Sequence, residues 1–277
     1  MTTTRLALFS LLFCCALPLQ AYAGSNKPSP IHCATSNITS SMTKTPTTWH
    51  VKVHKSYPHR SNAFTQGLIY HQDTLFESTG HYGQSTISQL DLTSGKIIKQ
   101  LPLSDNVFGE GTTIWNEQLI QLTWKSGAVY RYSLPAMTLE QTQTIQGEGW
   151  GLTHNNQSLI TSNGSAQLSF RNPLSLAVES TLNVTYLGRP LKKLNELEWV
   201  NGCVLANIWQ SHYIAIIDPT SGQTTSLIDL SRIIAHEQKT GTSEVANGIA
   251  WHAANQRLLI TGKYWQRIYE IELVASQ

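Results

Sequence analysis

The sequence predicts an all-β domain, on the evidence of strand-like runs, frequent turn residues and internal repetition. Short runs of Val, Ile, Leu, Thr and Tyr alternate with Gly, Asn, Asp and Pro, and helical periodicity is nearly absent. The segment DLTSG at 91–95 recurs as DPTSG at 218–222, each time between two apolar runs. The chain therefore repeats a structural unit, and the period of the repeat indicates the architecture.

The repeated unit begins with a short motif that returns every 40 to 51 residues. The copies are FTQGLIY at 64, FGEGTTIW at 108, EGWGLTH at 148, LNELEWV at 194 and VANGIAW at 245. Each copy leads into a second and a third strand-like run, and the spacing is that of a four-stranded propeller blade. The last copy ends near Leu273 without a fourth strand, which the segment at 48–57 could supply. The sequence therefore predicts a five-bladed β-propeller closed by an N-terminal strand.

The N-terminal 47 residues lie outside this repeat. Residues 1–23 combine Arg5, an apolar run and small residues at Ala21 and Ala23, which is typical of a secretory signal peptide and too short for a membrane span. Residues 24–47 are rich in Ser, Thr and Pro, so we expect a flexible leader that contributes little to the core. The functional domain is expected over 48–277, in a protein that is secreted or periplasmic.

Charge and cysteine content exclude several classes of partner and scaffold. The formal net charge is +2, and no basic cluster stands out, so neither nucleic acid nor an anionic membrane is an expected partner. Cys14 and Cys15 would leave with the signal peptide. Cys33 and Cys203 could then form one disulfide, but not a disulfide scaffold. We expect a monomer.

The start of each first strand should face the central channel of a propeller, with loops around its mouth. Two rings of side chains follow from this placement. The first ring consists of Gln66, Glu110, Trp150, Glu196 and Asn247, with Asn195 beside Glu196, and the second of Thr79, Trp124, Asn163, Trp209 and Lys263. A purely structural repeat would repeat these positions, whereas the five units differ there. The two rings are therefore the predicted functional site.

Glu110 is the most informative position, because it stands between Gly109 and Gly111. A polar residue in a surface turn is one interpretation. The other is that two flanking glycines let the backbone approach its neighbours closely and present the carboxylate into a site.

Several residues have structural interpretations that compete with functional ones. We expect core packing between blades for Trp115, Trp199, Trp251 and Tyr70. Lys263 would be a solvated strand end in the competing view. The ten histidines show no metal-ligand spacing, and neither a nucleophile elbow nor a P-loop motif is found. No metal site is predicted from these motifs.

Seven motifs, in order and in spacing, resemble the plant and bacterial type of glutaminyl-peptide cyclotransferase. They are FTQGL, ESTGHYGQS, FGEG, LTWKSG, GEGWGLT, LNELEWVNG with ANIW, and NGIAW with TGKYW, and together they cover about 48–273. The resemblance implies a five-bladed propeller that needs no zinc or other cofactor. It also implies conversion of the N-terminal glutamine of a peptide into pyroglutamate, with release of ammonia.

The resemblance assigns roles to individual residues. Glu110 would take a proton from the attacking α-amine and return one to the departing nitrogen. Lys263, Gln66 and Asn195 would hold the amide or stabilise the developing oxyanion. The aromatic walls would consist of Phe64, Phe108, Trp124, Trp150 and Trp209, with Trp150 open to a shift of one residue within GEGWGLT. Glu196 is assigned to the channel wall or to a structural ion in the channel.

Two other functions stay open at this point. The first is a secreted propeller that binds peptide N-termini without catalysis, in which Glu110 would pair with an ammonium group. The second is a metal-dependent lactonase-type propeller, which would need several inward carboxylates and amides around one ion. Three tryptophans at the same mouth argue against the lactonase interpretation.

Overall fold

The structure is a computed structural model that describes residues 30–33 and 46–275. The predicted signal peptide and most of the predicted leader lie outside these ranges. Within them the chain is almost entirely β-structure, with α1 (Ser231–Glu237) and the 3₁₀ helix η1 (Gln238–Thr240) inserted before the last three strands. The prediction of an all-β fold is confirmed.

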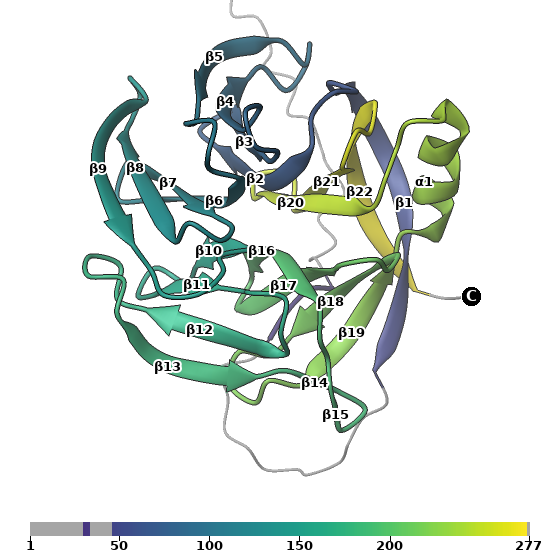
Figure 1. The fold of residues 1–277 in the computed structure, drawn as a ribbon. Helices are drawn as coiled ribbons and strands as arrows, with labels where there is room; N and C mark the ends of the chain where they lie inside the picture. Colours follow the sequence, from purple (N-terminus) through teal and green to yellow (C-terminus); the bar gives the residue numbers. More distant parts are fainter. Residues whose placement is uncertain (1–29, 34–45, 276–277) are drawn as a thin grey trace, which may run out of the picture.

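Three sheets of four antiparallel strands follow one another along the chain (Figure 1). The first contains β2 (Thr65–His71), β3 (Thr74–Thr79), β4 (Thr86–Leu90) and β5 (Ile97–Pro102). The second contains β6 (Gly109–Trp115), β7 (Gln118–Thr123), β8 (Ala128–Ser133) and β9 (Thr138–Thr144). The third contains β10 (Leu152–His154), β11 (Leu159–Thr161), β12 (Gln167–Arg171) and β13 (Val178–Asn183), and a small hairpin of β14 (Thr185–Tyr186) and β15 (Arg189–Pro190) follows it.

The remaining strands form one sheet of eight, in the order β16-β17-β18-β19-β1-β22-β21-β20. Its members are β16 (Leu194–Val200), β17 (Cys203–Ile208), β18 (Tyr213–Ile217), β19 (Thr224–Asp229), β20 (Ala246–His252), β21 (Arg257–Gly262), β22 (Arg267–Ala275) and the N-terminal β1 (Thr47–Pro58). The sheet thus joins two antiparallel groups of four through β1.

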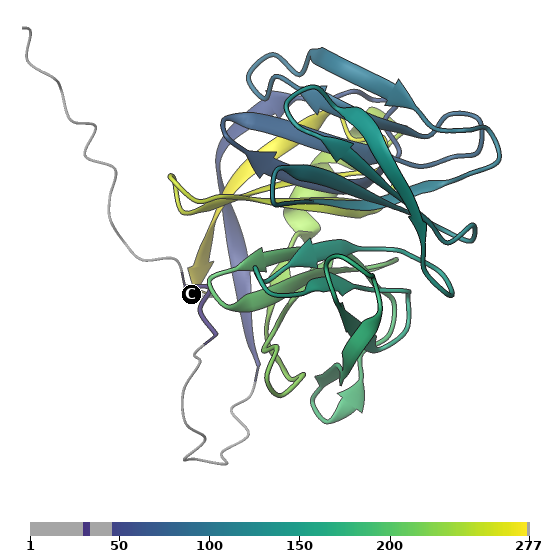
Figure 2. The same cartoon turned by 90° about the vertical axis from the view of Figure 1, so that its left-hand side faces the viewer.

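Strand β1 brings the two ends of the described chain together. It pairs antiparallel with β22 along most of its length, so it is the fourth strand beside β20, β21 and β22. Its first residues also pair in parallel with β19, with Trp49 opposite Ile228. Figure 2 shows β1 running along the side of the molecule beside β22.

The first strands of the five units lie at the centre of the molecule, as Figure 1 shows for β2, β6, β10, β16 and β20. Each contacts its neighbours in a closed order, β2 with β6, β6 with β10, β10 with β16, β16 with β20 and β20 with β2. The outer strands β5, β9 and β13 are mostly exposed, because each is the edge strand of its sheet.

Hydrophobic clusters fill the spaces between neighbouring groups of four strands. The aromatic residues predicted to pack there do so: Tyr70, Trp115, Trp199 and Trp251 each pack on a different cluster. These contacts confirm the interpretation of the four residues as core packing. In the described ranges, no helix is long and apolar enough to cross a membrane.

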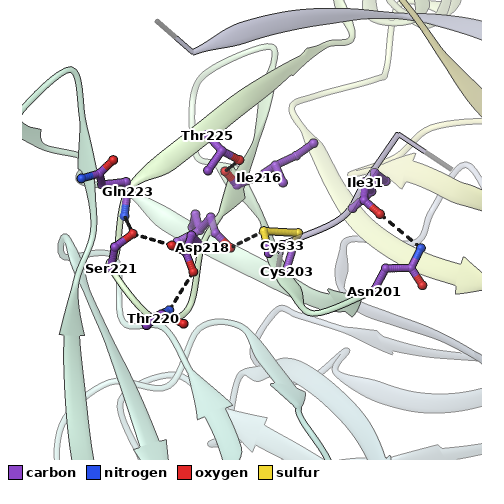
Figure 3. Close-up of a disulfide and its surroundings, with 11 residues drawn as sticks. Ile31, Cys33, Asn201, Cys203, Ile216, Asp218, Thr220, Ser221, Gln223 and Thr225 are labelled. Carbon is purple, nitrogen blue, oxygen red and sulfur yellow. Dashed lines mark hydrogen bonds between the residues drawn. A yellow bond between two sulfur atoms is a disulfide. The ribbon is translucent and has the colours of Figure 1, made fainter. Parts of the chain in front are cut away.

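A short stretch of the predicted leader is part of the fold. Ile31 is only 1% exposed and belongs to a core cluster, so residues 31–33 contradict the expectation of a leader that contributes little core. Figure 3 shows how it is held: Cys33 is joined to Cys203 by a disulfide, and Asn201 donates its Nδ2 hydrogen to the carbonyl of Ile31 at 3.2 Å. The disulfide that the sequence left open is therefore present.

Candidate functional site

β-Bulges recur at the start of four of the five first strands. The register shifts lie between Thr65 and Gly67, Gly109 and Thr112, Leu194 and Leu197, and Ala246 and Ile249. A bulge leaves residues outside the ladder and re-aims their side chains. The polar residues predicted for the first ring, Gln66, Glu110, Asn195 and Asn247, all occupy these bulges. The same local irregularity therefore turns a different polar side chain into the site from each strand.

Glu110 lies in the β6 bulge, and its side chain is buried, with the whole residue 4% exposed. Both flanking glycines lie against neighbouring backbone. A Cβ on Gly109 would stand 2.6 Å from the Thr79 carbonyl oxygen, and one on Gly111 would stand 2.5 Å from the Leu152 nitrogen. The two glycines therefore let three strands approach one another around the carboxylate, which rules out an exposed turn for Glu110.

Burial raises the pKa of Glu110 well above its ordinary value, and the nearby charge of Glu148 acts in the same direction. The charge of Lys263 and a hydrogen bond from Gln66 oppose this increase. Lys263 is itself buried, which lowers its pKa to about 8 despite the favourable charges of Glu110 and Glu244. Burial thus raises the pKa of Glu110 and lowers that of Lys263, as is typical of catalytic acids and bases.

Lys263 is positioned by the turn that follows β21. Its backbone N–H donates to the Val245 carbonyl at 3.0 Å, and its Nζ lies 4.1 Å from the centre of the Phe64 ring. The ring of Trp265 is fully buried directly against Gly262, and its Nε1 donates to the Glu244 carbonyl at 2.9 Å. These contacts exclude the interpretation of Lys263 as a solvated strand end.

Three buried polar atoms of the site have no partner in the described part of the chain. They are Oε2 of Glu110, Oδ1 of Asn195 and Oδ1 of Asn247. Buried polar atoms are nearly always hydrogen-bonded, so each orphan calls for an explanation. All three belong to bulge residues of the inner strands, which together offer acceptors for the N–H groups of a ligand.

The aromatic residues of the site form two separate groups of rings in contact. Phe108 lies between Phe64 and Trp124, with edge-on contacts at 6.0 and 5.7 Å between ring centres. Trp150 meets Trp209 edge-on at 5.7 Å. The structure thus brings together all five predicted aromatic residues in two groups, and it places Trp150 among them without a shift of register.

Glu196 and Thr79, which the sequence assigned to the two rings, do not occupy the positions equivalent to Glu110 and Trp124. On β16 the residue equivalent to Glu110 is Asn195, and Glu196 is the next one. The Glu196 carboxylate accepts backbone N–H groups of Leu68 and Ile249, so it joins three inner strands. Thr79 pairs with Thr65 inside the ladder; the position equivalent to Trp124 is Gly80, where a Cβ would stand 2.2 Å from Phe108.

Asn163 is exposed and caps a turn by accepting hydrogen bonds from Ser165, so it also lies outside the site. In the described residues, no group of three or more His, Cys, Asp or Glu side chains is arranged to hold a metal ion.

Sequence reasoning overlooked Glu148, His81 and Tyr264. Glu148 accepts hydrogen bonds from two site tryptophans, at 2.8 and 2.9 Å. His81 Nε2 and the Tyr264 hydroxyl lie 2.7 Å apart beside Phe64, and both residues have positive φ, 87° and 61°. Left-handed backbone at non-glycine residues concentrates at functional sites. The motifs GEGWGLT, ESTGHYGQS and TGKYW contained these residues, but their spacing alone gave no signal.

The fold and the site define an all-β protein with a buried carboxylate, Glu110, whose pKa is raised, and with two groups of aromatic rings. The family model described as "Glutamine cyclotransferase" matches residues 29–273. Glutaminyl-peptide cyclotransferase from Arabidopsis thaliana is 39% identical over 227 residues, which cover 80% of this chain and 71% of that protein. The crystal structure of Myxococcus xanthus glutaminyl cyclase, also 39% identical, superimposes with a TM-score of 0.78 and covers 84% of this chain and 100% of its own. The chain belongs to the glutamine cyclotransferase family.

Proposed function

We propose that this protein is a glutaminyl-peptide cyclotransferase that converts the N-terminal glutamine of peptides and proteins into pyroglutamate and ammonia. The observation that carries the proposal is Glu110, a buried carboxylate with a raised pKa and an unpartnered oxygen. The family membership and the relatives' names support the same reaction.

The reaction needs proton transfer more than it needs a nucleophile from the protein. The substrate's α-amine nitrogen forms a bond to its own side-chain amide carbon, and the bond from that carbon to the amide nitrogen breaks. Glu110 takes a proton from the attacking amine and gives one to the leaving nitrogen, which departs as ammonia. A carboxyl group with a raised pKa can do both.

The other site residues position the substrate and stabilise charge. Phe64, Phe108, Trp124, Trp150 and Trp209 enclose the glutamine side chain and favour the folded conformer that places the amine near the amide carbon. Lys263, still largely protonated below about pH 8, stabilises the oxyanion that develops on the amide oxygen. Asn195 and Gln66 hold the amide and the main chain of the substrate.

The finer architecture is part of this proposal. We infer five four-stranded blades around a central channel, with β1 as the outer strand of the last blade. The closed order of contacts among β2, β6, β10, β16 and β20, and the pairing of β1 with β22, support it. The site then lies at the end of the channel where the bulges gather.

The protein is proposed to act as a monomer in the periplasm or outside the cell. A disulfide between Cys33 and Cys203 favours an oxidising compartment. No cofactor takes part in the proposed chemistry. A structural ion in the channel would take no part in it either.

The two alternative functions fit the site less well. A binder that pairs Glu110 with an ammonium group would favour an ionised carboxylate, whereas the burial of Glu110 raises its pKa. A lactonase-type metal site would use inward carboxylates, but Glu196 and Glu198 accept backbone N–H groups of β20.

Ammonia release from a glutamine-initiated dipeptide tests the function, with an asparagine-initiated dipeptide as matched substrate and each assay run with and without a chelator. Ammonia together with a cyclised product, from the glutamine peptide alone, supports the cyclotransferase. Binding of both peptides without turnover contradicts it and leaves the non-catalytic binder. Turnover that disappears with chelator contradicts the metal-free mechanism.

A further inference from the structure

We propose that Glu148 is a positioning residue that joins the two halves of the aromatic wall, and so fixes the conformation in which the substrate cyclises. The proposal rests on the proposed function for its kinetic consequences. Its structural part, two indole groups held by one carboxylate oxygen, stands on the geometry alone.

The aromatic wall has a gap between Trp124 and Trp150. Phe64, Phe108 and Trp124 form one chain of edge-on contacts, and Trp150 with Trp209 forms another. No ring contact joins the two groups within the described residues. A wall in two parts can confine a side chain only if the parts keep a fixed separation.

Glu148 spans this gap with a single atom. Its Oε2 accepts the indole Nε1–H of Trp124 at 2.8 Å and that of Trp150 at 2.9 Å. Both distances are those of well-formed N–H···O hydrogen bonds. The two indole N–H groups therefore converge on one oxygen, which sets the separation of the rings.

The backbone places Glu148 for this task. The next residue, Gly149, donates its N–H to the Trp124 carbonyl at 3.1 Å, and a Cβ on Gly149 would stand 3.0 Å from the Thr123 carbonyl oxygen. The loop before β10 therefore lies directly on the end of β7. Glycine at 149 permits this approach, and the side chain of Glu148 is carried with it to the two indoles.

Other contacts fix each ring from its remaining sides. Lys125 Nζ lies 4.1 Å from the centre of the Trp124 ring, and Lys193 Nζ lies 5.5 Å from that of Trp209. A Cβ on Gly164 would stand 2.7 Å from the Trp150 ring. These contacts hold single rings, whereas Glu148 alone of these groups connects one half of the wall to the other.

The test compares Glu148→Ala with Glu148→Gln, because glutamine keeps an acceptor oxygen at the same reach and loses the charge. Each enzyme is assayed at its own pH optimum, since Glu148 also affects the pKa of Glu110. We expect kcat of the alanine variant to fall by about ten- to a hundredfold, more than KM rises, because misplacement by about 1 Å can have effects of this size. The glutamine variant should recover kcat to within about threefold of wild type.

Glu140 provides a matched control. It lies on the exposed outer strand β9, where its side chain accepts a hydrogen bond from Gln118, so Glu140→Ala should leave the kinetics of the wild type unchanged. A loss of kcat in Glu148→Gln equal to that in Glu148→Ala contradicts the proposal, since the charge and not the hydrogen bonds would then matter. An unchanged kcat in Glu148→Ala contradicts it as well.

A measurement without substrate separates this proposal from the proposed function. In the ¹⁵N-labelled protein, the indole N–H signals of Trp124 and Trp150, assigned through Trp124→Phe and Trp150→Phe, should both be protected from hydrogen exchange. Protection should persist in Glu148→Gln. Exchange as fast as that of a free indole in the wild type would overturn the proposal, whether or not the protein turns over glutamine peptides.

Discussion

Asn247 donates its Nδ2 hydrogen to Oε1 of Gln66 at 3.0 Å, and this contact decides which end of the Gln66 amide faces Glu110. Because the oxygen of Gln66 is engaged, its amide N–H group is the end that is left to donate to the Glu110 carboxylate. Asn247 is itself fixed, because the same Nδ2 donates to the Thr65 carbonyl at 3.0 Å. Three bulge residues from three strands thus form one oriented chain that ends on the proposed catalytic group.

Asn247→Ala should therefore impair catalysis, although the proposed mechanism gives Asn247 no contact with the reacting atoms. The variant frees Gln66 to rotate, and we expect kcat/KM to fall by about tenfold, in line with about 1.4 kcal/mol per factor of ten and with the value of one oriented hydrogen bond. Steady-state ammonia release measures it. Asn255→Ala, which removes side-chain hydrogen bonds at the opposite end of β20, is the control and should keep wild-type kcat/KM. Equal activity of the two variants would show that the orientation of Gln66 has no catalytic effect.

Lys263→Met should move the acidic limb of the pH profile to higher pH. The positive charge of Lys263 lowers the pKa of Glu110, against the larger effect of burial. Without that charge the pKa of Glu110 rises further, so ionised Glu110 appears only at higher pH. Profiles of kcat/KM with one substrate measure the change, because the titration of the substrate amine is the same for both enzymes. A limb that stays in place, or moves to lower pH, contradicts the coupling of the two groups.

Glu198 should make the protein less stable as pH rises from about 5 to 8. It is buried on β16, and burial raises its pKa to about 8 against the N–H bonds from Trp251 and Trp199. A raised pKa means that the folded state retains the proton, so this stabilising contribution is complete below the ordinary value near 4.5 and is lost through pH 8. A tenfold difference in proton affinity between the folded and unfolded states corresponds to about 1.4 kcal/mol of unfolding free energy.

Urea unfolding of wild type and Glu198→Gln at several pH values tests this expectation. The stability of the variant relative to wild type should increase with pH over that interval. Glu77 serves as an internal contrast: its pKa is lowered to about 2 by His59 and Arg60, so its contribution is lost only as pH falls below about 4.5. A difference between wild type and variant that does not change with pH would mean that Glu198 titrates at its ordinary value.

Cys33→Ser should lower stability and leave catalysis intact. The disulfide connects residues 170 positions apart and lies at the far end of β16 and β17 from Asn195 and Trp209. Removing a native disulfide typically costs about 2–5 kcal/mol of unfolding free energy. Thermal unfolding and ammonia release measure the two effects, with reduced wild type as a second comparison. A large loss of kcat at a temperature where the variant is folded would contradict the separation of the disulfide from the site.

The repeat length predicted the five first strands, because each of them begins at or near a recognisable sequence motif. The bulges left no mark in the sequence, and Glu196 and Thr79 were each counted one residue away from the positions equivalent to Glu110 and Trp124 in the other units. A bulge adds a residue to one strand without changing the composition of the motif, so the sequence does not mark which residue points into the site. Glu110 is buried in the bulge of β6, which its two flanking glycines mark directly.

Contacts between units could not be predicted from the sequence. Glu148 reads as a charged turn residue, and only the position of β7 beside the loop before β10 brings it to two indoles. Ile31 lies in a segment with the composition of a flexible leader, yet Cys203 holds its neighbour Cys33 and its side chain enters the core. In both cases a partner more than twenty residues away decides the environment.

Ammonia release by wild type and Glu110→Gln, measured side by side on a glutamine-initiated dipeptide, tests the central claim most directly. Glutamine keeps the size of the side chain and its acceptor oxygen but cannot carry the proton. We predict that turnover falls by at least about a hundredfold while the dipeptide still binds, as the loss of a general acid–base catalyst requires. Turnover in Glu110→Gln within a few-fold of wild type would contradict the assignment of proton transfer to Glu110.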